Sequence, residues 1–187
     1  MPLHQEGPWT YEDYSALPDD GNRYEILYGR LYVTPSPTAG HQIVSKRLQH
    51  LLYQLELAGQ GYVFNAPTDL LMPGADPVQP DLVFLTAAQK HLIRKKGIVG
   101  PPELLVEILS PGTARADRTV KLRNYSENGV RQYWIADPNA RTVEFLFLDG
   151  ESYRLEASLG PGDVYRSPHL EGLVVDLEWL FSDLPEE

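Results

Sequence analysis

Cysteine is absent from the 187-residue chain. Its absence excludes a disulfide framework, a zinc site with thiolate ligands, an iron–sulfur cluster and a thiol nucleophile. The sequence also lacks a run of about 18 apolar residues, which is the length that would cross a membrane. Residues 1–10 contain no basic stretch followed by an apolar one, so the sequence predicts no signal peptide. We therefore expect a cytoplasmic protein with no membrane partner.

Positive charge is scarce as well. The chain has 16 lysine and arginine residues against 26 aspartate and glutamate residues, which gives a formal net charge of −10. Proteins that hold nucleic acid mainly by charge are usually basic, so the net charge speaks against DNA as a partner. Cationic side chains nevertheless gather at Arg94–Lys96 and again at Arg115, Arg118, Lys121 and Arg123. These groups form either a local basic rim or ordinary solvated helix faces.

The pattern of apolar residues predicts helices and strands in alternation. A chain of this length fits one domain and can bury roughly 70% of its unfolded surface. We expect helices at residues 11–17 after an N-cap at Thr10, at 38–58, 87–96 and 113–128, and after a cap at Asp176. We expect strands at 23–27, 30–33, 81–85, 104–109, 132–136 and 142–148, with strand-like segments over 150–175. Residues 62–72 read as an extended segment in which Pro67 suggests an edge or a bulge. This order indicates an α/β or α+β fold with a mixed sheet.

Two acidic residues stand out by their position. Glu107 interrupts the apolar run 104–109, which is typical of a buried strand. A buried carboxylate is costly unless it is paired, protonated or bound to a cation. Asp81 opens the other apolar strand, directly after Pro80. If the two strands are neighbours, both carboxylates meet at one end of the sheet, where a divalent cation would offset their repulsion. Oxygen ligands of this kind favour Mg²⁺ or Mn²⁺ over zinc.

Each of these residues also has a simpler interpretation. Glu107 can form a structural ion pair in the core with Lys121 or with an arginine. Glu25 reads as a solvated strand residue beside Arg23. Lys121 lies four residues after Asp117 on a predicted helix, which is the spacing of a surface ion pair. Taken one at a time, the residues do not decide between a structural and a chemical role.

The order of these residues along the chain changes the interpretation. Gln79-Pro-Asp81, Glu107-Ile-Leu-Ser110 and Asp117-Arg-Thr-Val-Lys121 together resemble the PD-(D/E)XK nuclease superfamily, which has the restriction-endonuclease-like fold. More narrowly, the chain resembles the Uma-type family of bacterial restriction-endonuclease-like proteins. The residues that carry this likeness are Thr10–Tyr14, Arg23–Glu25, Thr34–Thr38, His41, Val78–Asp81, Val106–Pro111, Asp117, Arg118, Lys121, Tyr125, Gly129, Val130, Tyr133, Trp134, Asp137 and Pro138.

The resemblance implies one restriction-endonuclease-like domain over residues 1–187. Its family-like core would cover residues 10–150, and a β-rich extension would cover residues 151–187. The implied architecture is a mixed central β-sheet flanked by helices, with extra C-terminal strands. The implied activity is Mg²⁺-dependent (or Mn²⁺-dependent) hydrolysis of phosphodiester bonds by a DNA endonuclease.

The resemblance also assigns roles to single residues. Asp81 and Glu107 would be metal ligands, with the carbonyl of Ile108 as a third. Glu25 would be an outer carboxylate or a ligand of a second metal. Asp81 and Glu107 would hold the metal without having to act as bases. We expect a structural role for Tyr125.

The sequence departs from the superfamily pattern at one position. A lysine normally lies two residues after the strand glutamate, and here that position is Leu109. The resemblance implies that Lys121 supplies the ammonium group from the following helix, where it would orient a water or offset charge on the phosphate. Gln79 and His41 would line the pocket. On its own, His41 reads equally as an exposed histidine near the start of a long helix.

Two other functions stay open at this point. A non-catalytic scaffold or interaction protein that retains the nuclease fold is favoured by Leu109 and by the acidic composition. A metal-dependent phosphohydrolase of small nucleotides would need no basic face for DNA. A narrow pocket would favour the phosphohydrolase, and a long open groove would favour the nuclease.

We also predict a homodimer. The strands after Gln132 are rich in aromatic and β-branched residues, more than one core is expected to cover. Exposed apolar surface of that kind usually marks an interface. The residues concerned are Tyr133, Trp134, Val143, Phe145 and Phe147.

Overall fold

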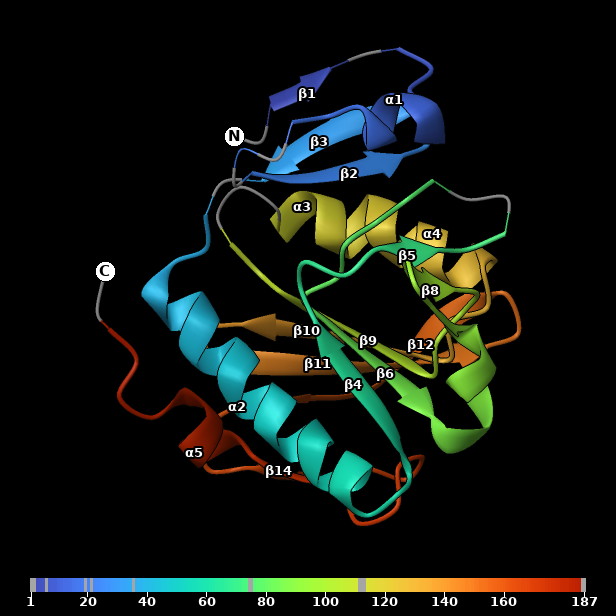
Figure 1. Cartoon of the computed structure of the whole chain (residues 1–187). Helices are drawn as coiled ribbons and strands as arrows, with labels where there is room; N and C mark the ends of the chain where they lie inside the picture. The colour runs from blue at the N-terminus through green and yellow to red at the C-terminus, as the bar shows by residue number, and fades with distance from the viewer. Residues whose placement is uncertain are drawn as a thin grey trace.

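A six-stranded mixed sheet runs through the middle of the molecule (Figure 1). The computed structural model describes residues 3–5, 7–18, 20, 22–34, 36–73, 76–110 and 114–185. Across the sheet, the strands are β12 (Ser152–Leu159), β11 (Thr142–Asp149), β10 (Gln132–Asp137), β9 (Leu104–Ile108), β6 (Leu82–Thr86) and β4 (Gly61–Asn65). Strands β9 and β10 are parallel and the other neighbours are antiparallel, so the predicted mixed sheet is confirmed.

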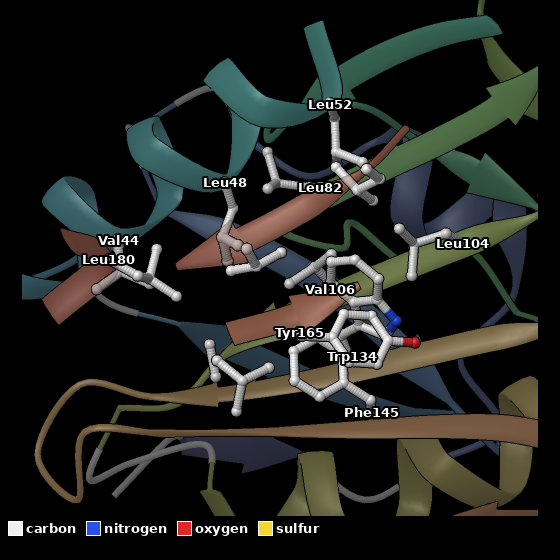
Figure 2. Packing of buried hydrophobic residues seen from close by; sticks show 14 of the residues in the cluster. Val44, Leu48, Leu52, Leu82, Leu104, Val106, Trp134, Phe145, Tyr165 and Leu180 are labelled. Atoms are coloured by element: carbon white, nitrogen blue, oxygen red, sulfur yellow. The ribbon is translucent and has the colours of Figure 1, made fainter. Parts of the chain in front are cut away.

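Apolar clusters cover both faces of this sheet. Neighbouring residues of a strand point to opposite sides, so they pack into different clusters. In β6, Leu82 packs in the apolar cluster that faces helix α2 (Ala39–Leu57), whereas Val83 packs in the cluster on the other face. Figure 2 shows the α2 side, where Leu48 and Leu52 approach the sheet. Burial on both faces explains why β6 and β9 appear in the sequence as continuous apolar runs.

A three-stranded N-terminal sheet lies at one end of the molecule (Figure 1). It consists of β1 (Leu3–Gln5), β3 (Arg30–Thr34) and β2 (Arg23–Leu27), in that order. Helix α1 (Tyr11–Ser15) precedes β2, and Thr10 caps it as predicted, through a reciprocal hydrogen-bond pair with Asp13. The N–H of Ile26 donates to the carbonyl of Pro77 at 2.9 Å. This bond joins the N-terminal sheet to the segment that leads into β6.

The helical segment after β9 contains a π turn. Helix α3 (Ala114–Ala116), the π-helical turn η2 (Asp117–Lys121) and α4 (Leu122–Glu127) follow one another without a break. The predicted helix start at Thr113 lies outside the described residues, as do Pro35 and Pro111 of the motif series. Turns of this type are rare inside helices and often occur at functional sites. Here the turn contains two buried charged residues, Asp117 and Lys121.

Two predicted elements differ from the structure. The extended segment over 62–72 is divided at Pro67, which has no N–H to donate, and β4, which ends before it, is an edge strand of the central sheet as Pro67 suggested. The next strand, β5 (Leu70–Leu71), belongs to a small sheet with β8 (Gly97–Val99) and β7 (Ile93–Arg94). The helix predicted over 87–96 is wrong beyond Leu92, where the 3₁₀ helix η1 (Ala87–Leu92) ends. Ile93 then continues into β7, from which it packs against the second apolar cluster.

The C-terminal residues share the core of the rest of the chain. Strand β12 is an edge of the central sheet, and β13 (Val164–Arg166), β14 (Val174–Asp176) and α5 (Leu177–Phe181) contribute to the cluster on the α2 side. Tyr165 stacks on Phe145 with ring centroids 3.6 Å apart. Asp176 caps α5 as predicted, because its side chain accepts from the N–H of Trp179.

The aromatic residues that motivated a homodimer are buried within the chain. Tyr133, Trp134, Val143 and Phe145 are all fully buried, and Phe147 stacks on the ring of His169 at 4.0 Å. The expectation of an exposed aromatic surface is therefore wrong, and a homodimer loses the observation that motivated it. No helix in the described part of the chain combines the length and apolar character needed to cross a membrane.

Candidate active site

Asp81 and Glu107 lie on neighbouring strands at the same end of the pair. Strands β6 and β9 are antiparallel, with Leu82 opposite Val106. Asp81 precedes Leu82 by one residue and Glu107 follows Val106 by one, so both carboxylates lie just beyond the same pair of residues. The two strands are therefore neighbours, which was the condition for the two carboxylates to lie close together.

Asp81 accepts three hydrogen bonds although only 3% of its surface is exposed. Oδ1 accepts from the guanidinium of Arg23 at 2.5 Å, and Oδ2 faces Nε2 of His41 at 3.1 Å and accepts from the N–H of Ile108 at 2.8 Å. Burial alone would raise the pKa of Asp81, but the His41 hydrogen bond and the Arg23 charge hold it well below its usual range. Asp81 is therefore ionised, and the reading of His41 as an exposed residue is wrong.

Glu107 is 1% exposed and is contacted by side chains from the helical segment after β9. Its Oε1 accepts from Nζ of Lys121 at 3.0 Å and from the hydroxyl of Tyr125 at 2.7 Å. Burial raises the pKa of Glu107 to about 8; Lys121 acts in the opposite direction, and nearby carboxylates add to the increase. Glu107 therefore holds a proton far more readily than a solvent-exposed glutamate does.

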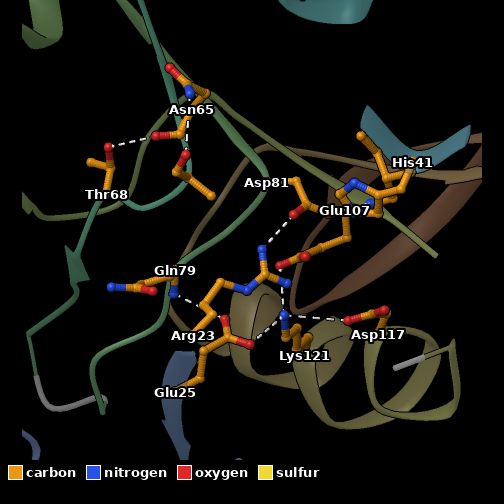
Figure 3. A network of polar contacts seen from close by, with 12 residues as sticks. Arg23, Glu25, His41, Asn65, Thr68, Gln79, Asp81, Glu107, Asp117 and Lys121 are labelled. Carbon is orange, nitrogen blue, oxygen red and sulfur yellow. Dashed lines mark hydrogen bonds and ion pairs between the residues drawn. The ribbon is translucent and has the colours of Figure 1, made fainter. Parts of the chain in front are cut away.

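Lys121 contacts three carboxylates at once (Figure 3). Its Nζ lies 3.0 Å from Glu107 Oε1, 3.0 Å from Glu25 Oε2 and 3.4 Å from Asp117 Oδ1. Burial would lower the pKa of Lys121, but the three carboxylates outweigh burial and raise it above its usual range. The pair with Asp117 inferred from spacing exists, but the expected surface location is wrong, because Lys121 is 2% exposed.

Glu25 and Gln79 connect the N-terminal sheet to this network. Oε1 of Glu25 accepts from the backbone N–H of Gln79 at 2.9 Å, while Oε2 faces Lys121. The amide group of Gln79 donates to Tyr14 at 3.0 Å and to Asp69 at 2.9 Å, and Tyr14 donates to Asp69 at 2.7 Å. Glu25 is buried, so its interpretation as a solvated strand residue is wrong.

The network holds more acidic than basic groups. Four buried carboxylates face two permanently charged cations, Arg23 and Lys121. The carboxylates outnumber these cations by two, and the raised pKa of Glu107 means that a proton takes up part of the difference. Buried charge without a counter-charge is costly, so the network favours the uptake of protons or of a further cation. The four carboxylates belong to Glu25, Asp81, Glu107 and Asp117.

Residues 11–178 match the Uma2 family, described as "Putative restriction endonuclease". The chain belongs to this family. It is also similar to a solved structure described as a "putative nuclease belonging to DUF820" from Anabaena variabilis, with 18% identity and a TM-score of 0.77, over 94% of this chain and 98% of that chain. No curated protein matches the chain. At 18% identity the likeness shows the fold alone, and it confirms the predicted fold class.

Sequence reasoning gave too little weight to three residues of the Uma2 chain. Arg23 lies two residues before Glu25, and this strand spacing puts both side chains on one face, so a signal for Arg23 was present. Asp117 reads from spacing only as a surface partner of Lys121. Tyr125 lies four residues after Lys121, which also places the two on one helix face. Its expected structural role did not include the hydrogen bond to a site carboxylate.

The donors of this site suit a hard divalent cation in kind, because the acidic groups all offer oxygen. The backbone N–H of Ile108 faces Asp81. In an extended strand the carbonyl of a residue points to the same side as its N–H, so Ile108 can add a carbonyl oxygen to this set of donors. Proteins usually hold Mg²⁺ with one or two carboxylates together with waters and substrate phosphates. In the described part of the chain, no group of three or more acidic or histidine side chains is arranged to hold a metal ion by itself. A cation here would therefore rest on Asp81, Glu107 and the carbonyl of Ile108, together with ligands from outside the chain.

The cationic residues after β9 do not form a free basic rim. Arg118 pairs with Glu144, Arg123 pairs with Glu127, and Lys121 is buried. Of the four cationic residues between positions 115 and 123, three are thus neutralised by carboxylates of the same chain. The expectation of a basic rim is wrong for these three residues, and any contact with DNA has to depend on other groups.

Proposed function

We propose that this Uma2 chain is a divalent-cation-dependent nuclease that hydrolyses phosphodiester bonds in DNA. Family membership supports the nuclease class. The excess of buried carboxylates around Lys121 supports dependence on a cation, and it is the observation that carries the proposal. A proton on Glu107, whose pKa burial raises to about 8, takes up part of this excess, and a bound cation would replace that proton.

Mg²⁺ or Mn²⁺ is the cofactor that these donors suit. Asp81, Glu107 and the carbonyl of Ile108 would hold it, and Glu25 would act as an outer carboxylate. When bound there, such a cation polarises a phosphate oxygen and lowers the pKa of a water ligand. Asp81 is already ionised, whereas Glu107, with its pKa raised to about 8 by burial, has to release its proton before it can act as a ligand.

Lys121 would place the attacking water or offset charge on the phosphate. An ammonium group has three N–H donors, and in the structure three carboxylates surround it. If Glu107 turns from Lys121 towards a bound cation, one donor of the ammonium group would become free for water. Glu25 and Asp117 still hold the ammonium group in position, so Lys121 keeps both its charge and its place.

The cavity that the described residues form beside Lys121 is too small to hold a nucleotide. This cavity, lined by Glu25, Tyr32 and Asp117, among others, has a volume of about 10 Å³, which is enough for roughly one water molecule. A nucleotide needs a far larger pocket. A non-catalytic scaffold is the second candidate function, because Arg23 and Lys121 already pair with the carboxylates.

Calorimetric titration with Mn²⁺ tests the cation site. We expect the wild type to bind Mn²⁺ and Asp81→Asn to lose this binding. Asp149→Asn is the matched control, because Asp149 is an exposed aspartate that also contacts an arginine, at the end of β11. Equal binding by the wild type and Asp81→Asn would show that no cation is held at Asp81.

Cleavage of duplex, branched and single-stranded DNA tests the activity. We expect weak cleavage that is stronger with Mn²⁺ than with Ca²⁺, because Ca²⁺ tolerates loose geometry and activates water poorly. Glu107→Gln and Asp81→Asn should each remove metal binding and cleavage together. DNA binding should be poor above ~0.2 M salt, because few phosphates are neutralised. Wild-type protein that binds Mn²⁺ but cuts no substrate better than Asp81→Asn would leave the scaffold function in place of the nuclease.

A further inference from the structure

Arg23 is the most exposed charged residue of the network. Its side chain is 17% exposed, whereas none of the carboxylates exceeds 3%. It lies at the first position of β2, and Figure 3 shows its guanidinium group between Asp81 and Lys121. Of the two permanent cations, Arg23 is therefore the one that a ligand from solvent can reach first.

The guanidinium of Arg23 has unused hydrogen-bonding capacity. Within the described part of the chain, its Nε atom is buried and has no hydrogen-bond partner. Buried donors are nearly always paired, so an unpaired one inside a charged cluster is available for a ligand that the described residues do not supply. A guanidinium group presents its donors as a planar fork that matches two oxygens of a phosphate.

Arg23 and a divalent cation would compete for Asp81. Oδ1 carries Arg23, while Oδ2 contacts His41 and the N–H of Ile108. A divalent cation at this carboxylate would repel the guanidinium group strongly at contact distance. The N–H of Ile108 is fixed in the backbone and His41 is buried, so the flexible and more exposed side chain of Arg23 is the group that a cation would displace first.

We propose, building on the function proposed above, that Arg23 occupies the place of the divalent cation at Asp81 in the resting protein and binds a DNA phosphate once a cation has replaced it. Lys121 is unsuited to this role, because it is buried among three carboxylates. Arg23 thereby links the binding of the cation to the binding of DNA. The phosphate-binding group becomes available only when the site is loaded.

Titration calorimetry with Mn²⁺ tests the first half of this proposal. Arg23→Gln should bind Mn²⁺ about tenfold more tightly than the wild type, which is the scale of a partly buried charge interaction. Arg23→Lys keeps the positive charge and should stay close to the wild type. The matched control is Arg154→Gln, because Arg154 also contacts a carboxylate, that of Asp149, but on the surface of β12. Circular dichroism checks that each variant is folded.

Binding of a labelled DNA duplex, measured by fluorescence anisotropy, tests the second half. In EDTA, the wild type and Arg23→Gln should bind equally, because Arg23 is engaged by Asp81. In Ca²⁺, Arg23→Gln should bind about tenfold more weakly, and the slope of log affinity against log salt should become shallower by about one unit. Arg154→Gln should match the wild type under both conditions.

The outcomes separate this inference from the function on which it rests. If the wild type binds Mn²⁺ but Arg23→Gln binds it no more tightly, the inference is overturned and the metal site stands. If Arg23→Gln weakens DNA binding equally in EDTA and in Ca²⁺, Arg23 is an ordinary surface contact and the coupling is overturned. Should Arg23→Gln fail to fold, Arg23→Lys decides, because losing the planar fork should weaken DNA binding in Ca²⁺ alone. If the wild type and Asp81→Asn titrate alike, the proposed function itself fails.

Discussion

Lys121 meets Glu107 from a separate helical segment, with its Nζ 3.0 Å from Oε1 although 14 residues separate the two in sequence. The superfamily pattern that the sequence resembles would put the lysine at Leu109, one residue after the end of β9. Leu109 is instead buried in the apolar cluster on this face of the sheet. The ammonium group therefore reaches the glutamate from the helix packed against the strand, and its neighbours there include two further carboxylates.

Removal of the Lys121 charge should destabilise the fold. Lys121→Met leaves three buried carboxylates without their shared cation, and breaking a buried ion pair in this way typically costs about 3–5 kcal/mol. Urea unfolding at neutral pH measures the change. Lys96→Met is the matched control, because Lys96 is exposed, and it should stay within about 0.5 kcal/mol of the wild type. Equal stability of the two variants would contradict the paired arrangement.

Much of the fold could be predicted because it depends on local pattern. The continuous apolar runs in β6 and β9 follow directly from the burial of both faces of these strands. The caps at Thr10 and Asp176 are likewise visible, since a short polar side chain before a helix satisfies free N–H groups. The π turn at Asp117–Lys121 has no comparable local signal. A helical periodicity looks the same on both sides of it.

The candidate site was only partly predictable, for a physical reason. Glu107 is conspicuous because a charge inside an apolar strand needs a partner. The contact between Arg23 and Asp81 joins residues 58 positions apart, and it depends on how the N-terminal sheet packs against the central one. No period or spacing encodes that packing. The same packing buries Glu25, which in sequence looks like any polar strand residue.

Tyr125 should stabilise the fold through its hydroxyl group. This group donates to Glu107 at 2.7 Å and both residues are buried, so Tyr125→Phe leaves a carboxylate oxygen with one donor fewer. We expect a loss of about 1–3 kcal/mol in the free energy of unfolding. Tyr53→Phe, at an exposed position on α2, should change the stability little. Thermal or urea unfolding of the three proteins measures both effects, and a neutral Tyr125→Phe would show that the hydrogen bond contributes nothing.

The C-terminal helix should be as important for stability as the central sheet. Leu180 of α5 is fully buried in the cluster on the α2 side. Leu180→Ala should therefore cost about 2–5 kcal/mol through lost burial and the cavity that it leaves. Glu178→Ala changes an exposed residue of the same helix and controls for helix propensity. A loss below about 1 kcal/mol for Leu180→Ala would mean that the C-terminal segment is not part of the cooperative core.

The stability of the wild type should fall as the pH rises through the range in which Glu107 titrates. Burial, together with nearby Asp117, Asp81 and Glu25, raises the pKa of Glu107 to about 8 against the opposing effect of Lys121, whereas in the unfolded chain it returns to about 4.5. The folded state therefore binds more protons than the unfolded state between these values. The stabilisation of the fold by the proton on Glu107 is fully present below about pH 4.5 and is lost as the pH rises through about 8.

Urea unfolding from about pH 5 to about pH 9 measures this dependence. Glu107→Gln carries no titrating group at this position and should lack that part of the slope, while Lys121 keeps its contacts with Glu25 and Asp117. Glu171→Gln, at an exposed position, should keep the wild-type slope. Asp81 does not interfere, because Arg23 and His41 hold its pKa low despite burial, so its stabilising effect is lost only in acid. Parallel profiles for the wild type and Glu107→Gln would contradict the raised pKa of Glu107.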